Sequence, residues 1–160
     1  MSVMTVGVSP EKIKELRSQL RGALLEPGSP EYDQARKLYN GMIDKRPALI
    51  ARVVDTADVI ASVNFARENG VSLAVRGGGH SGPGLGSVDD GLVIDLSEMR
   101  SVRVDPSNKT IRAEGGCVWG DVDHAGHAFG LTVPTGFISS TGVGGLALGG
   151  GSGYPPASTA

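Results

Sequence analysis

The chain has 160 residues, of which 39% are hydrophobic and 20% are charged, and its formal net charge is −2. These values are typical of one globular domain and give no basic surface, so we expect no nucleic-acid and no membrane partner. A single cysteine, Cys117, excludes an internal disulfide and a zinc site built from cysteines. Residues 1–15 lack a long apolar run, and no stretch reaches transmembrane length, so we expect a cytoplasmic protein.

Residues 1–40 predict a helical segment ahead of the main domain. Pro10 follows Ser9, a pattern typical of the start of a helix. Apolar residues then recur at helical spacing, which predicts a helix over residues 10–25. A Pro-Gly-Ser-Pro stretch ends that helix, and residues 31–38 indicate a second, shorter one.

The next part of the chain predicts a strand, a helix and a second strand. Residues 48–54 are apolar and rich in β-branched side chains, a helix then runs to Asn69, and Gly70 favours its end in a left-handed conformation. Residues 71–75 predict a buried strand. The two strands of such a βαβ unit are parallel, and ligands bind at the carboxyl ends of parallel strands.

A glycine-rich loop follows at that carboxyl end, with the sequence Arg76-Gly77-Gly78-Gly79-His80-Ser81. Successive glycines let the backbone turn tightly and let a ligand approach the main chain closely. Exposed backbone N–H groups form a concave site for anions, beside which we expect the positive charge of Arg76. The loop therefore predicts binding of an anionic cofactor, with His80 at its rim.

Beyond the loop, shorter elements predict a second subdomain. Residues 92–96, 102–105 and 110–114 indicate short strands, the last two joined as a hairpin, and residues 118–129 indicate a helix closed by Gly130. A second glycine-dense stretch covers residues 136–153. The expected fold class is α+β, with a small parallel βαβ subdomain and a second, mainly antiparallel β subdomain.

The strand, the Arg-Gly-Gly-Gly-His-Ser loop and the later Val93-Ile94-Asp95-Leu96-Ser97 resemble the FAD-linked oxidases related to berberine bridge enzyme, in the vanillyl-alcohol oxidase group. The resemblance covers residues 47–154 and implies a PCMH-type FAD-binding domain over residues 41–160. It implies that the glycine loop cradles the FAD pyrophosphate and that a neutral His80 imidazole bonds covalently to a methyl group of the flavin ring. The implied reaction is oxidase-like: hydride transfer from an alcohol, sugar or amine carbon to FAD.

The same resemblance implies that the second glycine-dense stretch lies along the pyrophosphate and the edge of the flavin. The cofactor-binding residues implied there are Pro134, Thr135, Gly136, Ser140, Thr141, Gly142, Gly144, Gly145, Leu146, Gly149, Gly150 and Gly153. Relatives with two covalent bonds carry a cysteine where this chain has Ile138. Attachment through His80 alone is therefore implied.

Two other readings of these motifs are disfavoured. Residues 142–147 fit the dinucleotide pattern G-x-G-x-x-A, but no acidic residue follows about 20 positions later, as an NAD site requires. His124 and His127 share one face of the expected helix, which we interpret as its polar outer surface, so we expect no metal site. A cofactor-free domain with a structural or assembly role stays open as an alternative function.

The resemblance also implies parts that this sequence does not contain. Relatives carry a substrate domain and a later segment that supply most of the catalytic residues, so we assign no catalytic residue here. We expect the sequence to be a fragment, a truncated paralogue or the product of a frame disruption. Uncovered apolar surface predicts a homo-oligomer, and another chain is a candidate source of the substrate domain.

Overall fold

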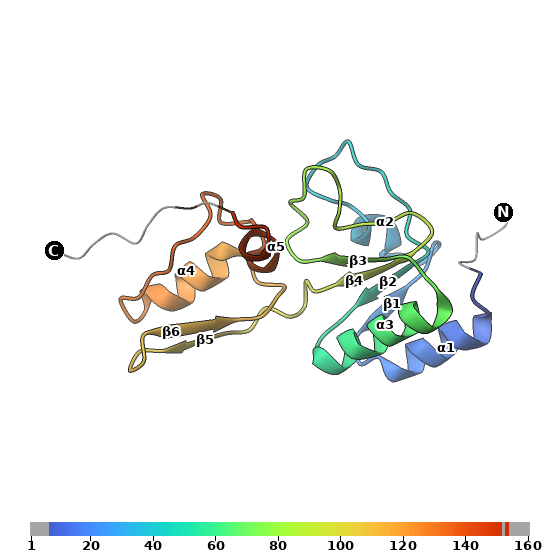
Figure 1. Cartoon of the computed structure of the whole chain (residues 1–160), viewed down its shortest axis with the longest axis horizontal. Coiled ribbons are helices and arrows are strands. Elements are labelled where there is room, and N and C mark those ends of the chain that lie inside the picture. The colour runs from blue at the N-terminus through green and yellow to red at the C-terminus, as the bar shows by residue number, and fades with distance from the viewer. Residues whose placement is uncertain (1–6, 152, 154–160) are drawn as a thin grey trace.

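The computed structural model describes residues 7–151 and residue 153. Tyr154 and the other residues predicted to extend the second glycine-dense stretch lie outside them. The elements are α1 (Pro10–Gln19), β1 (Ala23–Leu25), α2 (Tyr32–Ala35), β2 (Leu49–Arg52), α3 (Thr56–Asn69), β3 (Leu73–Arg76), β4 (Leu92–Asp95), β5 (Val102–Asp105), β6 (Thr110–Ala113), α4 (Trp119–His127) and α5 (Val143–Leu148). Figure 1 shows two subdomains, with α5 between them.

The first subdomain is a four-stranded sheet in the order β1-β2-β4-β3. Strands β2 and β3 both run parallel to β4, which confirms the predicted parallel βαβ unit and places β4 between its two strands. Strand β1 pairs antiparallel with β2, so a strand from the N-terminal segment completes the sheet. In this register, Arg52 and Arg76 both lie opposite Asp95, at the carboxyl ends of the three parallel strands.

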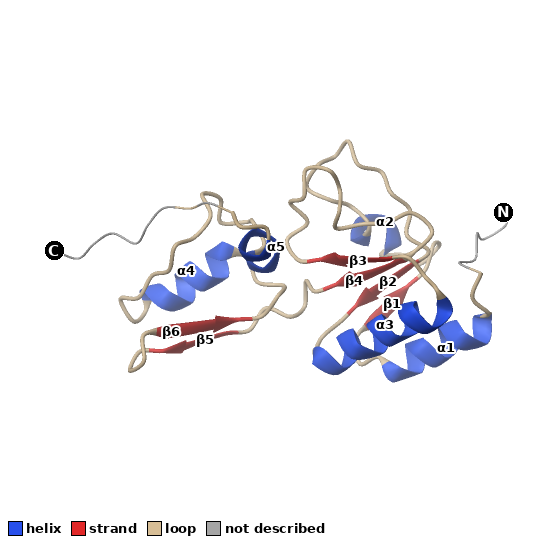
Figure 2. Ribbon diagram, in the orientation of Figure 1, coloured by secondary structure: helices blue, strands red, loops and turns tan. Residues whose placement is uncertain are grey.

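The core lies on both faces of this sheet. Helices α1 and α3 cover one face, where Leu16, Phe65 and Ile94 are buried together (Figure 2). The short helix α2 covers the other face, where Tyr32 packs with Val93. Because β4 is buried on both faces, its four residues are all inaccessible, as is typical of a central parallel strand.

The prediction of one helix over residues 10–25 is wrong beyond Gln19. The buried carboxylate of Asp58 accepts hydrogen bonds from the backbone N–H groups of Arg21, at 2.9 Å, and Gly22, at 3.0 Å. Gly22 passes so close to β2 that an added Cβ would lie 2.0 Å from the carbonyl oxygen of Arg52. These contacts turn the chain, and residues 23–25 pair with β2 instead of continuing the helix.

The strand expected to be buried, at residues 71–75, is half exposed. Strand β3 lies at the edge of the sheet, and its side chains alternate between exposed and buried. Leu73 is 39% exposed and Val75 52% exposed. The apolar run that predicted burial therefore marks a strand with one uncovered face.

The second subdomain consists of the β5–β6 hairpin and α4 (Figure 2). The hairpin confirms the predicted antiparallel part of an α+β fold. Helix α4 ends at His127, earlier than expected, and Gly130 closes the turn that follows it with a φ of 65°. Phe129, expected to be the last residue of that helix, lies beyond its end and is 54% exposed.

Asp121 ties the start of α4 to the loop before the hairpin. Its carboxylate accepts hydrogen bonds from the backbone N–H of Val118, at 2.9 Å, and from Nε and Nη2 of Arg100, at 3.0 and 2.6 Å. The hydrogen bonds from Arg100 are the largest cause of a lowered pKa for Asp121. The ionised carboxylate therefore stabilises the folded state.

We expect the free energy of unfolding to depend less on acidic pH once this carboxylate is removed. A carboxyl group whose pKa is lower in the folded state than its unfolded value, about 3.9, stabilises the fold above that pH and loses this effect as the pH falls through the folded pKa. Urea unfolding of Asp121→Asn should therefore show a shallower loss of stability below about pH 4 than the wild type. The matched control is Asp123→Asn, on an exposed residue of α4, and an unchanged slope in Asp121→Asn would contradict the prediction.

Within the residues that the structure describes, no helix is long and apolar enough to cross a membrane. The same residues hold no group of three or more His, Cys, Asp or Glu side chains suited to a metal ion. Cys117 is fully buried, and burial raises the pKa of its thiol.

Candidate cofactor site

The two glycine-rich stretches meet backbone to backbone. A Cβ added to Gly78 would lie 2.4 Å from the backbone nitrogen of Gly142, and one added to Gly142 would lie 2.3 Å from that of Gly78. Real Cβ atoms do not approach backbone atoms so closely, so only glycine permits this contact. The contact joins the carboxyl end of β3 to the residue that precedes α5, which lies beside it in Figure 1.

A pocket of about 390 Å³ lies at this junction. Residues 76–81 of the glycine loop form one part of its wall, and residues at and near the start of α5 form another. The predicted site residues that line it are Arg76, Gly77, Gly78, Gly79, His80, Ser81, Thr141, Gly142, Gly145 and Leu146, together with Val75, Leu85 and Gly86. The structure therefore brings the two predicted segments together around one cavity.

His80 lies at the pocket with its ring held on two sides. The ring of Tyr39 stacks on the imidazole, with centroids 4.1 Å apart and planes 15° from parallel. The Nε2 atom of His80 lies 3.3 Å from the hydroxyl oxygen of Ser140, at hydrogen-bonding distance. The sequence predicted both His80 and Ser140, whereas no pattern in the sequence indicated that Tyr39 contacts the site.

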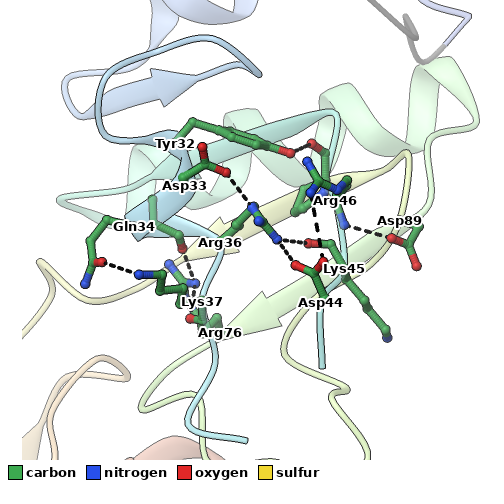
Figure 3. Close-up of polar contacts among 12 residues, drawn as sticks. Tyr32, Asp33, Gln34, Arg36, Lys37, Asp44, Lys45, Arg46, Arg76 and Asp89 are labelled. Atoms are coloured by element: carbon green, nitrogen blue, oxygen red, sulfur yellow. Dashed lines mark hydrogen bonds and ion pairs between the residues drawn. The ribbon is translucent and has the colours of Figure 1, made fainter. Parts of the chain in front are cut away.

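Arg76 lines the pocket as expected, but its charge is paired with a carboxylate. The residue is 8% exposed, and its Nη2 donates to Oδ2 of Asp95 at 2.7 Å while its Nε lies 3.4 Å from Oδ1. Its Nη1 donates to the carbonyl oxygens of Ala35 and Lys37, a contact visible in Figure 3. Because the charge of Arg76 is paired with Asp95, we assign Arg76 a structural role. It fixes the start of the glycine loop to β4 and to the chain around Ala35 and Lys37.

Several predicted residues lie outside the wall of this pocket, Gly144 within α5 and the others before or after it: Pro134, Thr135, Gly136, Gly149, Gly150 and Gly153. Gly153 lies against Thr135, since an added Cβ would be 1.7 Å from the carbonyl oxygen of Thr135. An added Cβ on Gly136 would be 2.6 Å from Leu146. These glycines allow the chain on either side of α5 to pack closely against the helix.

A second, more polar pocket of about 400 Å³ lies on the other side of the glycine loop. Its wall includes Lys37, which follows α2, and Arg52 and Ser97 at the carboxyl ends of β2 and β4, and it shares residues 76–79 with the first pocket. Residues 76–79 of the glycine loop thus belong to the walls of both pockets. Ligands of α/β sheets bind at this end of the strands.

The residues at the junction fit a dinucleotide cofactor with a diphosphate. The glycines leave a wall of bare main chain, and a methyl group at Gly78 or Gly142 would push that wall apart. Backbone amides are suitable donors to phosphate oxygens, and the imidazole of His80 is the nucleophilic side chain that borders the pocket. The site thus combines a main-chain cradle with one reactive nitrogen base.

Comparison with known proteins agrees with this geometry. Residues 47–156 match the model of the FAD binding domain family. An FAD-linked oxidoreductase of Dictyostelium discoideum is 39% identical over 144 residues, which are 89% of this chain and 31% of that protein. The crystal structure of 6-hydroxy-D-nicotine oxidase from Arthrobacter nicotinovorans is similar with a TM-score of 0.82 and 36% identity, over 84% of this chain and 30% of that one.

A second similar structure is BBE-like 1 of Physcomitrella patens, with a TM-score of 0.76 and 29% identity over 85% of this chain and 30% of that protein. The chain therefore belongs to the FAD binding domain family, the FAD-binding part of flavin-dependent oxidoreductases. The resemblance to berberine bridge enzyme-like oxidases and the PCMH-type fold are confirmed. The chain spans about 30% of the length of the relatives that it matches.

Proposed function

We propose that this chain binds FAD in the 390 Å³ pocket and bonds it covalently through His80. The observation that carries the proposal is the backbone contact between Gly78 and Gly142, with His80 and Ser140 beside it. In this proposal the amides of the glycine loop and of the residues before α5 bind the diphosphate. Pro134, Thr135, Gly136, Gly149, Gly150 and Gly153 act indirectly, by holding α5 against the pocket.

Attachment replaces one C–H bond of the flavin ring methyl and one N–H bond of the imidazole with a C–N bond. The two protons and two electrons that are released pass to the flavin, and dioxygen is the oxidant that then removes them. A neutral imidazole is needed, because only an unprotonated nitrogen has a free electron pair. Ser140, at 3.3 Å from Nε2, contributes by holding the ring in one orientation.

The variant His80→Ala should lose covalent flavin while it keeps non-covalent binding, since the cradle is main chain and contains no atom of the imidazole. Protein reconstituted with FAD is precipitated with acid, and the flavin that stays in the pellet is measured together with the intact mass. We expect the wild type to gain the mass of FAD and His80→Ala to release its flavin into the supernatant.

The control for this experiment is His127→Ala, which removes an exposed imidazole from α4, away from the pocket. It should retain covalent flavin. Flavin that stays bonded in His80→Ala would overturn the assignment of His80. A wild-type chain that remains colourless after FAD is added would instead favour a cofactor-free structural domain.

The activity of a complete protein is a wider part of the proposal. When bound, FAD supplies the acceptor for a hydride from an alcohol, sugar or amine carbon. The described residues contribute cofactor binding, and a substrate domain on the same or another chain would contribute the catalytic base. Self-association through exposed apolar side chains such as Leu148, which is 93% exposed, belongs to the same proposal.

A further inference from the structure

Residues 38–46, here called the strap, lie along the loop that contains His80. The backbone N–H of Tyr39 donates to the carbonyl oxygen of Gly79 at 3.2 Å, and Nδ2 of Asn40 donates to that of Gly82 at 2.9 Å. Further along, Nζ of Lys45 donates to the carbonyl oxygens of Gly84, at 3.0 Å, and of Ser87, at 2.9 Å. The strap therefore binds the main chain of the loop at four successive points.

The strap also fits the loop sterically. Gly84 has a φ of 75°. A Cβ added to Gly84 would lie only 2.8 Å from Cγ2 of Ile43, so the side chain of Ile43 fills the space beside this glycine. Leu38 packs in the same way over Gly79 and Gly86, where an added Cβ would contact its Cδ2 at 3.7 Å. The strap and the loop thus form one packed unit, without any contribution from a bound ligand.

Polar contacts hold the strap at both ends, as Figure 3 shows. At its start, Nη1 of Arg76 donates to the carbonyl oxygen of Lys37. Near its end, Arg36 binds the carboxylate of Asp44, and the backbone N–H of Arg46 donates to Oδ1 of Asp89 at 2.7 Å. The backbone of Tyr39 is consequently fixed, even though 69% of the residue is exposed.

The ring of Tyr39 is the part of the strap that contacts His80. It stacks on one face of the imidazole at a centroid distance of 4.1 Å, while Ser140 meets the edge of the ring at Nε2. A stacking partner covers the π face and leaves the in-plane nitrogen electron pairs accessible. The stack with Tyr39 thus restrains the side chain of His80 without covering its in-plane nitrogen atoms.

We propose that Tyr39 is a positioning residue for His80, which holds the imidazole in the orientation required for flavin attachment. The inference rests on the proposed function and adds to it a residue from outside both glycine-rich stretches. Loss of the stack leaves the imidazole free to occupy other rotamers, so the attachment reaction becomes slower. Retention of the FAD by the main-chain cradle is unaffected.

The test compares Tyr39→Leu with Tyr39→Phe, which keeps a stacking ring, and with Met42→Ala, which changes a 90% exposed strap residue. Each purified chain is mixed with FAD, and the covalent fraction is followed by intact mass over time. We expect attachment to slow about tenfold in Tyr39→Leu, the size expected for loss of one aromatic pair. Tyr39→Phe and Met42→Ala should react at the wild-type rate.

A second measurement needs no flavin. In the NMR spectrum of the flavin-free chain, the ring current of Tyr39 should displace the His80 ring protons, which are identified by their loss in His80→Ala. The displacement should persist in Tyr39→Phe and disappear in Tyr39→Leu. Thermal unfolding of all variants identifies any that are not folded.

These results separate the two proposals. Attachment by Tyr39→Leu at the wild-type rate, or His80 signals unchanged in that variant, overturns the positioning role. If the wild type takes up no FAD at all, the proposed function fails, and the ring-current comparison alone then decides whether Tyr39 orients His80.

Discussion

Replacement of Gly78 by alanine should prevent flavin incorporation by this chain. The added Cβ would lie 2.4 Å from the backbone nitrogen of Gly142 and 2.7 Å from its Cα, where neither atom belongs to a side chain that can move aside. The two glycine-rich stretches must then separate, and the amides that face the pocket move with them. Because a displacement of about 1 Å costs about 100-fold in rate, we expect at least that loss in attachment.

The matched control is Gly82→Ala, in the same loop, where an added Cβ has no heavy atom within 4 Å. It should incorporate FAD as the wild type does, as judged by intact mass and by flavin absorbance. Gly142→Ala should reproduce the loss, because its Cβ would approach Gly78 from the other side at 2.3 Å. Normal incorporation by Gly78→Ala would show that the backbone contact is not part of the binding site.

Removal of the carboxylate of Asp95 should strongly destabilise the fold. Asp95 is 1% exposed and pairs with Arg76, which is 8% exposed, at the carboxyl ends of β4 and β3. The variant Asp95→Ala leaves the guanidinium buried without a counter-charge, which costs about 3–5 kcal/mol in the free energy of unfolding. Urea denaturation followed by circular dichroism measures this difference.

Arg100→Ala provides the comparison, because it breaks an ion pair with Asp121 whose arginine side chain is 51% exposed. Such a pair contributes at most about 1 kcal/mol, so this variant should unfold close to the wild type. If Asp95→Ala and Arg100→Ala lowered the free energy of unfolding by similar amounts, burial would not explain how much the Arg76–Asp95 pair stabilises the fold.

The sequence predicted the fold class and most elements near the site, because the local signals there are strong. The βαβ unit, the β5–β6 hairpin and the glycine after α3 follow patterns of hydrophobicity and turn residues that depend on neighbouring positions only. The motifs that carry the family resemblance also located the two stretches that meet at Gly78 and Gly142. A short helix, α5, within the second stretch was missed, since its glycine-rich sequence is atypical of helices.

What the sequence could not predict depends on contacts between distant residues. The helix expected to reach residue 25 ends early because Asp58 binds the backbone at Arg21 and Gly22, a contact that no local pattern reveals. The pairing of Arg76 with Asp95 requires the insertion of β4 beside β3, which spacing alone does not specify. Tyr39 likewise contacts His80 only because the strap follows the loop in space.

The meeting of two glycines also has a consequence for how such a domain can diversify. Where peptide groups bind the ligand, the affinity does not depend on which side chains lie nearby. Side chains such as that of Thr141 in the pocket wall and that of Ser140 beside His80 can then be exchanged to change reactivity while the main-chain surface keeps its shape. Affinity for the ligand then depends on main-chain atoms, which every residue has, whereas reactivity depends on side-chain atoms, which substitution can change.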